Sequence, residues 1–573
     1  MQFLAINELS FRGDTEVCGD ECNDENIGGL FLRLFEFAMQ KDHHLRSIAN
    51  TMPKNAKYTS PEIQNEVISI MAKIVQNNII KECNEADIGR FCIKCDETRD
   101  ATNIEDMSLV VRYVQGGVAV EHLLCLVNMR AVDANSITDA IINELTRHSL
   151  DPTHIISQCY DGASVMSGCH GGVQKLLQDR LGKVIPYVHC FNHQLHLVIV
   201  HAMGAVPQAR NFFLLCEQLY VFFKRHFVSN IYDGQSLKRL LVQRWTGHLQ
   251  CALAVKNSRK EIVDALEIVS ESDAVSTQVS VEAQGLLAKV SKPEFAFQAA
   301  VAVKVLSLLV PANSMMQGKS CNIMLAAELL TSAREAIIQL RSDTQFDAFA
   351  TEAGMLKDDQ PTRPQRTRTH SKLLANFLVT STLGATGSTN DNTGNSNWDI
   401  QKQAYFALLD SVAGEMTARF EGSSLALLQA IEALLPSSKS FMKLAAVKPL
   451  ADLLQLQPDA LAAELSVATG FLQKKLPSDA TLESAAKEMT QLKDAFPSMY
   501  SLYAAALTIG VSTATCENSF STLTRILQPH RRSMTHARKA ELVLLAFEKN
   551  LTRQIDINEF ISEFATSSRR VVL

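Results

Sequence analysis

The sequence predicts an α/β protein in which a mixed β-sheet has helices packed on it, followed by a long helical region. Two observations support this prediction. Short apolar segments with strand patterns alternate with helical patterns between residues 91 and 190. From about residue 193 onward the 573-residue chain is almost entirely helical in pattern. The composition agrees, because 46% hydrophobic and 20% charged residues are typical of a folded globular chain.

Two helical segments are expected before the sheet. Residues 27–50 carry apolar side chains at helical spacing. A second helix is expected from about residue 60 to 82, because Ser60 is a typical N-cap and Pro61 suits the first helical position.

The sheet is predicted from the order of three strands, helix, strand, helix and strand, which is typical of a mixed sheet with helices packed on it. Gly116-Gly117 predicts a tight hairpin turn between the second and third strands. The strands are expected at 91–96, 108–114, 120–130, 154–161 and 184–190, and the helices at 134–148 and 170–182.

The rest of the chain divides by composition. Segments 193–228, 281–341 and 403–420 have helical patterns, whereas 360–400 is rich in Pro, Arg and small polar residues and predicts an exposed linker. We expect an N-terminal helical region at 1–84, the first part of the core at 85–250, helices at 251–490, and the last part of the core at 491–573.

Charge and cysteine usage narrow the possible classes of protein. The net charge is −6, so any binding of nucleic acid must come from local basic clusters. No segment has the composition expected of a membrane span, and the N-terminus does not resemble a secretory signal. The thirteen cysteines indicate reduced thiols in an intracellular protein. Cys18 and Cys22 have no partner pair at the distance of a zinc finger, and Cys92 and Cys95 lie in a predicted strand that points their side chains to opposite faces. We therefore predict no structural zinc.

Two aspartates stand at the ends of predicted strands. Asp96 ends the first strand and Asp161 ends the fourth. If these strands are neighbours, both carboxylates point into one crevice, where a divalent cation such as Mg²⁺ or Mn²⁺ relieves their repulsion. The alternative is that each aspartate only binds the amides of its own turn.

A third carboxylate is expected on a helix near the C-terminus. Segment 511–527 reads as a helix capped by Ser512 or Thr513, with Glu517 at the margin of its apolar stripe. That position allows Glu517 to reach the rim of a buried sheet, although an exposed helical glutamate fits the same pattern.

Several motifs resemble the hAT superfamily of DNA transposases, particularly the transposase-like region of zinc finger MYM-type proteins. They occur in the family's order and span residues 55 to about 550. The matching runs are NAKYTSPEIQNEVI (55–68), CDETRDATNIEDMSLVVRYV (95–114), CYDGASVMSGCHGGVQ (159–174), VHCFNHQLHLV (188–198), QRWTGH (243–248) and CENSFSTLTRI (516–526).

The resemblance implies an RNase H-like mixed sheet flanked by helices and interrupted by a large all-helical insertion. It also implies that Asp96, Asp161 and Glu517 form the catalytic set and hold two divalent metals, Mg²⁺ or Mn²⁺, that cleave and join DNA strands. Two further family motifs are Cys190/His193 and Arg244-Trp245. We favour a structural role over zinc binding for Cys190/His193. Arg244 and Trp245 are expected either to contact distorted DNA, with Trp245 stacking on a base, or to pack at the start of the insertion.

Two basic clusters are candidates for phosphate contacts, with ordinary solvated charge as the alternative. The C-terminal basic cluster comprises Arg525, His530, Arg531, Arg532, Arg538 and Lys539, and a second one comprises Arg363, Arg366, Arg368 and His370. Segment 537–551 has a broad apolar face that includes Leu542, Leu545 and Leu551. It could pack within the chain, but the resemblance favours a contact in a homodimer.

Two functions follow from these expectations. One is a metal-dependent DNA transposase-type nuclease; the other is a catalytically inactive nuclear protein that dimerises and binds DNA or protein. Val165 and Asn518 stand where many relatives of the resembled family have Asn and Arg, and no N-terminal zinc-binding reader is recognised, which favours the second. A small-molecule substrate is not expected, because the common catalytic motifs of metabolic enzymes are missing.

Overall fold

The computed structural model describes residues 1–12, 29–53, 58–240, 245–318, 321–357, 396–420 and 425–566. The chain forms two compact units. Unit 1 comprises residues 1–194, 313–328 and 421–573, and unit 2 comprises residues 195–312 and 329–420. Most of the predicted linker at 360–400 lies outside the described residues, as do Cys18 and Cys22.

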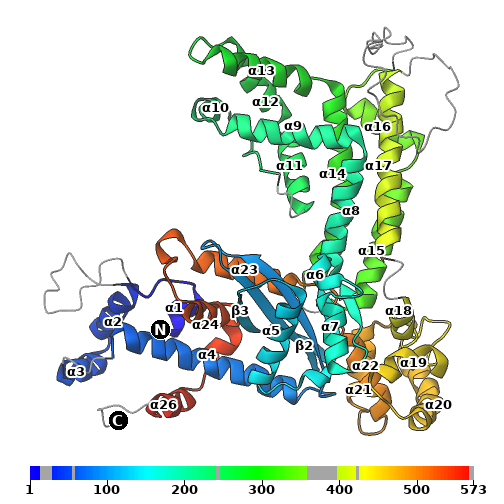
Figure 1. Cartoon of the computed structure of the whole chain (residues 1–573). Coiled ribbons are helices and arrows are strands. Elements are labelled where there is room, and N and C mark those ends of the chain that lie inside the picture. The colour runs from blue at the N-terminus through cyan, green and yellow to red at the C-terminus, as the bar shows by residue number, and fades with distance from the viewer. Residues whose placement is uncertain are drawn as a thin grey trace, which may run out of the picture. The chain divides into compact units, whose positions relative to one another are not determined.

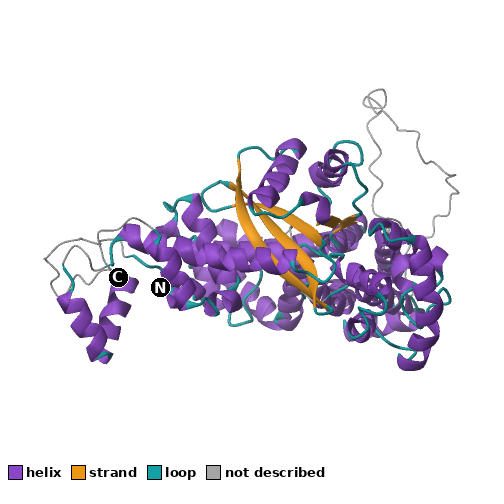
Figure 2. Ribbon diagram, turned by 90° about the horizontal axis from the view of Figure 1, so that it is seen from below, coloured by secondary structure: helices purple, strands orange, loops and turns teal. Residues whose placement is uncertain are grey.

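Unit 1 is built on one sheet, drawn in orange in Figure 2. The sheet has five strands in the order β3-β2-β1-β4-β5. β1 pairs antiparallel with β2 and parallel with β4, while β3 and β5 extend the two sides. This is the order of an RNase H-like fold, so the predicted fold class is confirmed. The strands are β1 (Phe91–Arg99), β2 (Glu105–Gln115), β3 (Val118–Met129), β4 (Ile155–Tyr160) and β5 (Tyr187–His189).

The turn between β2 and β3 forms as the two glycines predict. Gly116 and Gly117 have φ angles of 58° and 77°, a conformation that L side chains rarely adopt. β1 is longer than expected, because its residues up to Arg99 pair with the start of β2 at Glu105. The prediction that Asp96 ends the first strand is therefore wrong: Asp96 lies within β1, opposite Ser108.

The helices of unit 1 surround this sheet (Figure 1). The expected helix at 27–50 is divided in two at Asp42, whose carboxylate accepts from the amides of His44 and Leu45 and so caps the second helix. The helices are α1 (Gln2–Ile6), α2 (Leu30–Lys41), α3 (His43–Thr51), α4 (Pro61–Asn84), α5 (Ala134–Arg147), α6 (Ser164–Ser167), α7 (Val173–Leu181), α18 (Leu425–Glu432), α19 (Leu444–Leu453), α20 (Pro458–Lys475), α21 (Leu482–Thr490), α22 (Pro497–Thr508), α23 (Ala514–Ile526), α24 (His536–Phe547), α25 (Lys549–Arg553) and α26 (Ile557–Ala565).

The core of unit 1 joins both ends of the chain. α4 begins after Ser60, whose hydroxyl accepts from the amide of Ile63 at 3.4 Å, and it contributes Ile68, Val75 and Ile79 to the core. α24, from the other end of the chain, packs on α4 and β3. The C-terminal segment is therefore part of the core on which the sheet rests.

The described residues of unit 2 form helices and the loops between them, with no strand. Its helices are α9 (Pro207–Phe223), α10 (His226–Ile231), α11 (Trp245–Asn257), α12 (Arg259–Glu271), α13 (Thr277–Val290), α16 (Asp343–Glu352) and α17 (Asn397–Phe420). Three further helices contain residues of both units: α8 (Phe191–Ala205), α14 (Pro293–Met316) and α15 (Ile323–Gln339).

One helix of the described chain, α14, is long and apolar enough to cross a membrane by length and composition alone. Its most apolar window is 61% buried within the structure. A core helix meets the same criterion, and Lys304 and Pro311 interrupt the apolar run.

The core position of α24 predicts a large effect of truncating its side chains. Leu545 is fully buried, so we expect Leu545→Ala to lower the free energy of unfolding by about 2–5 kcal/mol. Ile557→Ala on α26, where the side chain is 71% exposed, is the control and is expected to change it by less than about 0.5 kcal/mol. Urea unfolding followed by circular dichroism measures both; equal effects would contradict the packing described.

Candidate functional site

Asp96 and Asp161 occupy matching positions on neighbouring parallel strands. Lys94 pairs with Cys159 in the register of β1 and β4, and each aspartate follows its member of this pair by two residues. Alternate residues of a strand share a face, so the two side chains leave the sheet on the same side. Both are half-buried. The expectation that these strands are neighbours is confirmed.

The turn contacts that we considered as an alternative are also present. Asp96 Oδ1 accepts from the amide of Glu97 at 3.0 Å, and Asp161 Oδ1 accepts from the amide of Ala163 at 3.2 Å. Tyr187 on β5 donates its hydroxyl to the main-chain oxygen of Asp161 at 2.8 Å, which fixes the chain where β4 ends. In each aspartate, one carboxylate oxygen is thus held by a main-chain amide.

The two aspartates and Glu517 influence one another electrostatically. Burial raises the pKa of Asp96 well above its usual range, and the negative charges of Glu517 and Asp161 raise it further. Burial, followed by the charges of Asp161 and Glu105, raises the pKa of Glu97 to about 7. The structure therefore brings the three predicted acids into one region, together with Glu97 as a fourth.

Glu517 lies in the first turn of α23, and α23 is held against the sheet by two polar contacts. Thr515 donates its hydroxyl to Glu121 of β3, and Ser519 donates to Ser108 of β2 at 2.9 Å. The two helical residues are four apart and so lie on one face of α23. Because Ser108 is opposite Asp96 in the sheet, these contacts set the position of Glu517 near Asp96.

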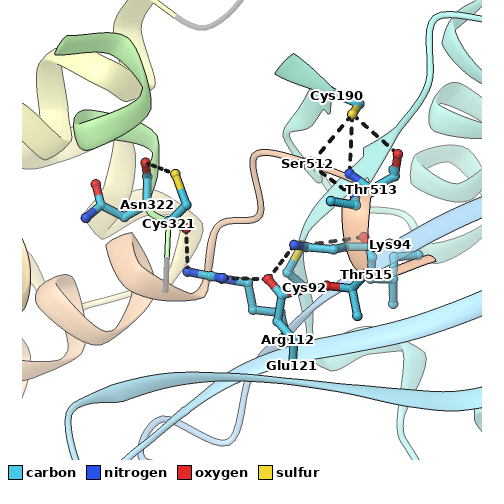
Figure 3. Close-up of polar contacts among 12 residues, drawn as sticks. Cys92, Lys94, Arg112, Glu121, Cys190, Cys321, Asn322, Ser512, Thr513 and Thr515 are labelled. Carbon is cyan, nitrogen blue, oxygen red and sulfur yellow. Dashed lines mark hydrogen bonds and ion pairs between the residues drawn. The ribbon is translucent and has the colours of Figure 1, made fainter. Parts of the chain in front are cut away.

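The start of α23 is fixed by the corner between β5 and α8 (Figure 3). The amide of Phe191 donates to Val511 at 2.9 Å, and Asn192 Nδ2 donates to the hydroxyl of Ser512 at 3.0 Å. Cys190 Sγ accepts from both the amide and the hydroxyl of Thr513, each at 3.3 Å. The structural role that we favour for Cys190 matches these contacts.

A buried cluster of charges lies under this helix. Glu121 pairs with Lys94 and with Arg112, whose Nη1 lies 2.6 Å from Glu121 Oε1, and all three residues are at most 3% exposed. Arg112 also donates to the main-chain oxygens of Leu507 at 2.9 Å and Cys321 at 3.1 Å (Figure 3). The cluster ties β1, β2 and β3 to the segments that precede α15 and α23.

We name Lys94, Arg112 and Glu121 the charge cluster; sequence reasoning missed it. A signal existed, because each residue interrupts an apolar strand: FCIKC, SLVVRYV and VEHLLCL. A charged residue inside a strand buried on both faces needs a partner. Gly510 allows the chain to pass over Lys94, since a Cβ there would lie 2.6 Å from Lys94 Cε.

The donor set of Asp96, Asp161 and Glu517 fits a hard divalent cation, because all three offer carboxylate oxygens. The three do not have ligand atoms within 4.8 Å of one another; among the described residues, only Cys125, Glu144 and His148 form such a group. Two metal ions about 3.5–4 Å apart would span a wider set of carboxylates than one ion does. A paired site therefore tolerates the wider spacing better than a single ion does.

Two residues considered as DNA contacts are buried, and for Trp245 the structure shows the alternative of packing at the start of the insertion. Lys539 is 2% exposed, and its Nζ pairs with Asp100 at 2.8 Å and with Asp106, so it cannot reach a phosphate. Trp245 is 2% exposed at the start of α11 and is packed within unit 2, so it cannot stack on a base in this conformation. Arg244 lies outside the described residues.

Some other members of the C-terminal basic cluster bind residues of the same chain, and others are exposed to solvent. Arg525 binds both carboxylate oxygens of Glu8, at 2.5 and 2.8 Å, and Arg531 donates to the main-chain oxygen of Glu8 at 2.9 Å. Arg532 and His530 are exposed. The second cluster, from Arg363 through Arg366 and Arg368 to His370, falls outside the residues that the structure describes.

The leucines predicted to form a dimer contact lie inside unit 1. Leu542 and Leu545 are buried in its core, and Leu551 packs against that core. Of the two alternatives given for this face, the structure shows packing within the chain: the apolar face of α24 is covered by α4 and β3.

The fold and the acids together define an RNase H-like protein whose third acid is carried by a C-terminal helix. Comparison with known families agrees. Residues 1–172 match the family described as ZMYM1/FAM200, RNase-like domain, and residues 482–548 match the hAT family C-terminal dimerisation region. The chain thus contains an RNase-like domain of the ZMYM1/FAM200 type and a hAT dimerisation region, and the resemblance is confirmed for these stretches. The second match includes α23 and Glu517.

The charge cluster predicts a stability effect of one neutral substitution. Glu121→Gln leaves Lys94 and Arg112 buried without their counter-charge, and we expect it to lower the free energy of unfolding by about 3–5 kcal/mol. Glu105→Gln is the control. It removes an ion pair with Arg99 at 2.7 Å, in which the Glu105 side chain is 26% exposed and the Arg99 side chain 64% exposed. We expect it to lower the free energy of unfolding by less than about 1 kcal/mol.

Glu121→Gln also tests how the stability of the protein depends on pH. Burial alone would raise the pKa of Glu121, but Lys94 and Arg112 lower it to about 2 from an ordinary value of 4.5. A lowered folded-state pKa stabilises the protein above pH 4.5, and this stabilisation is lost as the pH falls toward 2. Urea unfolding between pH 7 and pH 2 should show this loss in the wild type. An equal loss of stability in Glu121→Gln would show that Glu121 is not its source.

Proposed function

We propose that this protein is a hAT transposase-derived nuclease that cleaves DNA strands in the nucleus with divalent metal ions. The observation that supports it is the matching position of Asp96 and Asp161 on adjacent parallel strands, with Glu517 close enough to act on Asp96 electrostatically. Three acids drawn together from distant parts of the chain repel one another, and a divalent cation removes that repulsion.

Asp96, Asp161 and Glu517 are the residues that would hold Mg²⁺ or Mn²⁺. When bound, a metal pair activates the attacking oxygen and stabilises the leaving oxygen of a phosphodiester. The chain's own contribution is positioning. The amide of Glu97 orients Asp96, Tyr187 fixes the main chain of Asp161, and Thr515 and Ser519 hold the helix that carries Glu517.

The proposal predicts nicking of supercoiled plasmid DNA by the purified chain in Mn²⁺ or Mg²⁺. Asp161→Ala and Glu517→Gln should each reduce the rate at least about a hundredfold, because each removes a ligand that places positive charge at the reacting phosphate. Asp179→Ala is the control, since Asp179 is 53% exposed and pairs with Lys175 on α7. Gel electrophoresis measures the nicked product.

A second readout separates loss of metal from loss of folding. Mn²⁺ should raise the melting temperature of the wild type and of Asp179→Ala, but not that of Asp96→Asn, which should fold with an unchanged circular dichroism spectrum. A wild type that is inert on DNA and unaffected by Mn²⁺ would overturn the nuclease proposal.

A non-catalytic role is the second candidate, and specific observations favour it. The three acids are more widely spaced than a single-ion site, and two predicted DNA contacts, Lys539 and Trp245, are buried. In that case the fold acts through self-association and through binding of DNA or protein.

We further propose that the chain forms a homodimer through the region at 482–548 that matches the dimerisation family. No large hydrophobic side chain of that region is exposed among the described residues. A second copy would therefore bind at a polar surface or by exchanging equivalent helices.

The dimer has a direct test. Light scattering coupled to size-exclusion chromatography should give about twice the 63.2 kDa chain mass. Leu542→Ala should leave that mass unchanged in the folded fraction while lowering the melting temperature, because Leu542 is a core residue. A monomer at micromolar concentration would contradict the dimer, and a folded monomeric Leu542→Ala would return Leu542 to the interface.

A further inference from the structure

A second cluster of metal-ligating side chains lies in unit 1, on elements other than those that carry the three acids. Cys125 comes from β3, and Glu144 and His148 come from α5 and its C-cap. Their ligand atoms all lie within 4.8 Å of one another, the only such group of three among the residues that the structure describes. Glu144 and His148 are four residues apart, the spacing at which one helix presents two ligands on one face.

The three side chains are shielded from solvent without being sealed. His148 is 8% exposed, the Glu144 side chain is 17% exposed and Cys125 is half-buried. Cys125 and Glu144 also line a cavity of about 500 Å³, together with Lys73, Gln76 and other residues of α4, β3, α5 and α24. A ligand entering this cavity can reach the cluster.

A neighbouring side chain orients the imidazole. Gln76 Nε2 donates to the main-chain oxygen of Leu124 at 2.8 Å, which identifies that atom as the amide nitrogen. The same nitrogen lies 3.2 Å from His148 Nε2. Glu144 Oε2 lies 3.4 Å from the same ring nitrogen, so Nε2 is the atom of His148 that faces both Gln76 and Glu144. In the neutral imidazole a ring nitrogen without a proton can bind a metal ion.

We propose that Cys125, Glu144 and His148 form a Zn²⁺-binding site. Sulfur, nitrogen and oxygen donors from three protein residues suit zinc, and three protein ligands leave a fourth position open to water or a small ligand. The thiolate and the carboxylate together neutralise the divalent ion, so the complex carries no net charge into a shielded site. The thiol proton is released to solvent when zinc binds.

The site is independent of the proposed nuclease centre in both residues and metal type. Mg²⁺ and Mn²⁺ prefer oxygen ligands, whereas thiolate and imidazole select softer ions. Zinc here would join β3 to α5 beside the cavity, so binding should also stabilise unit 1 against unfolding.

The test uses the full-length chain, freed of metal by a chelator and titrated with Co²⁺ alone or Zn²⁺ alone. Co²⁺ should give a thiolate-to-cobalt charge-transfer band that saturates at about one equivalent and disappears on adding Zn²⁺. Cys125→Ser should abolish the band. Glu144→Gln and His148→Gln should weaken binding at least about tenfold.

Cys169→Ser is the matched control, because Cys169 is an exposed free thiol of the same unit, and it should keep both the band and the affinity. Asp161→Ala should also keep them, which separates this site from the nuclease centre. Each variant is first checked for the wild-type circular dichroism spectrum. Glu144→Gln and His148→Gln keep Cys125, so they test the site independently of any effect of Cys125→Ser on folding. A wild type without the band, or a Cys125→Ser variant that keeps it, would overturn the proposal.

Discussion

The attachment of α23 to the sheet is the interaction on which the carboxylate site depends. Asp96 and Asp161 are placed by the pairing of β1 with β4 and by contacts of the adjoining turns, but Glu517 follows them only after the whole of unit 2 in the sequence. Its position is set by Thr515 bound to Glu121, by Ser519 bound to Ser108, and by the corner that holds Thr513. Without these contacts the third acid has no fixed place beside the other two.

The charge cluster explains how such an attachment can be buried. Two cations and one anion lie out of contact with water, so Glu121 is held strongly ionised and accepts hydrogen bonds from several directions. Lys94 shares a face of β1 with Asp96. The cluster's excess positive charge therefore lies on the side of the sheet where the acids gather, and it offsets part of their repulsion before any metal binds.

Much of the sheet could be predicted from the sequence, because strand alternation and the two hairpin glycines are local signals. The proximity of Asp96 and Asp161 followed from their places in or next to two neighbouring strands. The ion pairs of Lys539 could not be predicted, and the choice between packing and surface contact stayed open for Trp245 and Leu545, because a helix pattern shows which face is apolar or basic but not what covers it. Lys539 meets Asp100 and Asp106, which are remote in sequence.

The segment at 482–548 combines two properties that are usually considered separately. It matches a dimerisation region, yet α23 and α24 within it contribute the third acid and part of the unit 1 core. Any association that rearranged these helices would also move Glu517 relative to Asp96. An association of that kind would couple self-association to the integrity of the carboxylate site through the same packing.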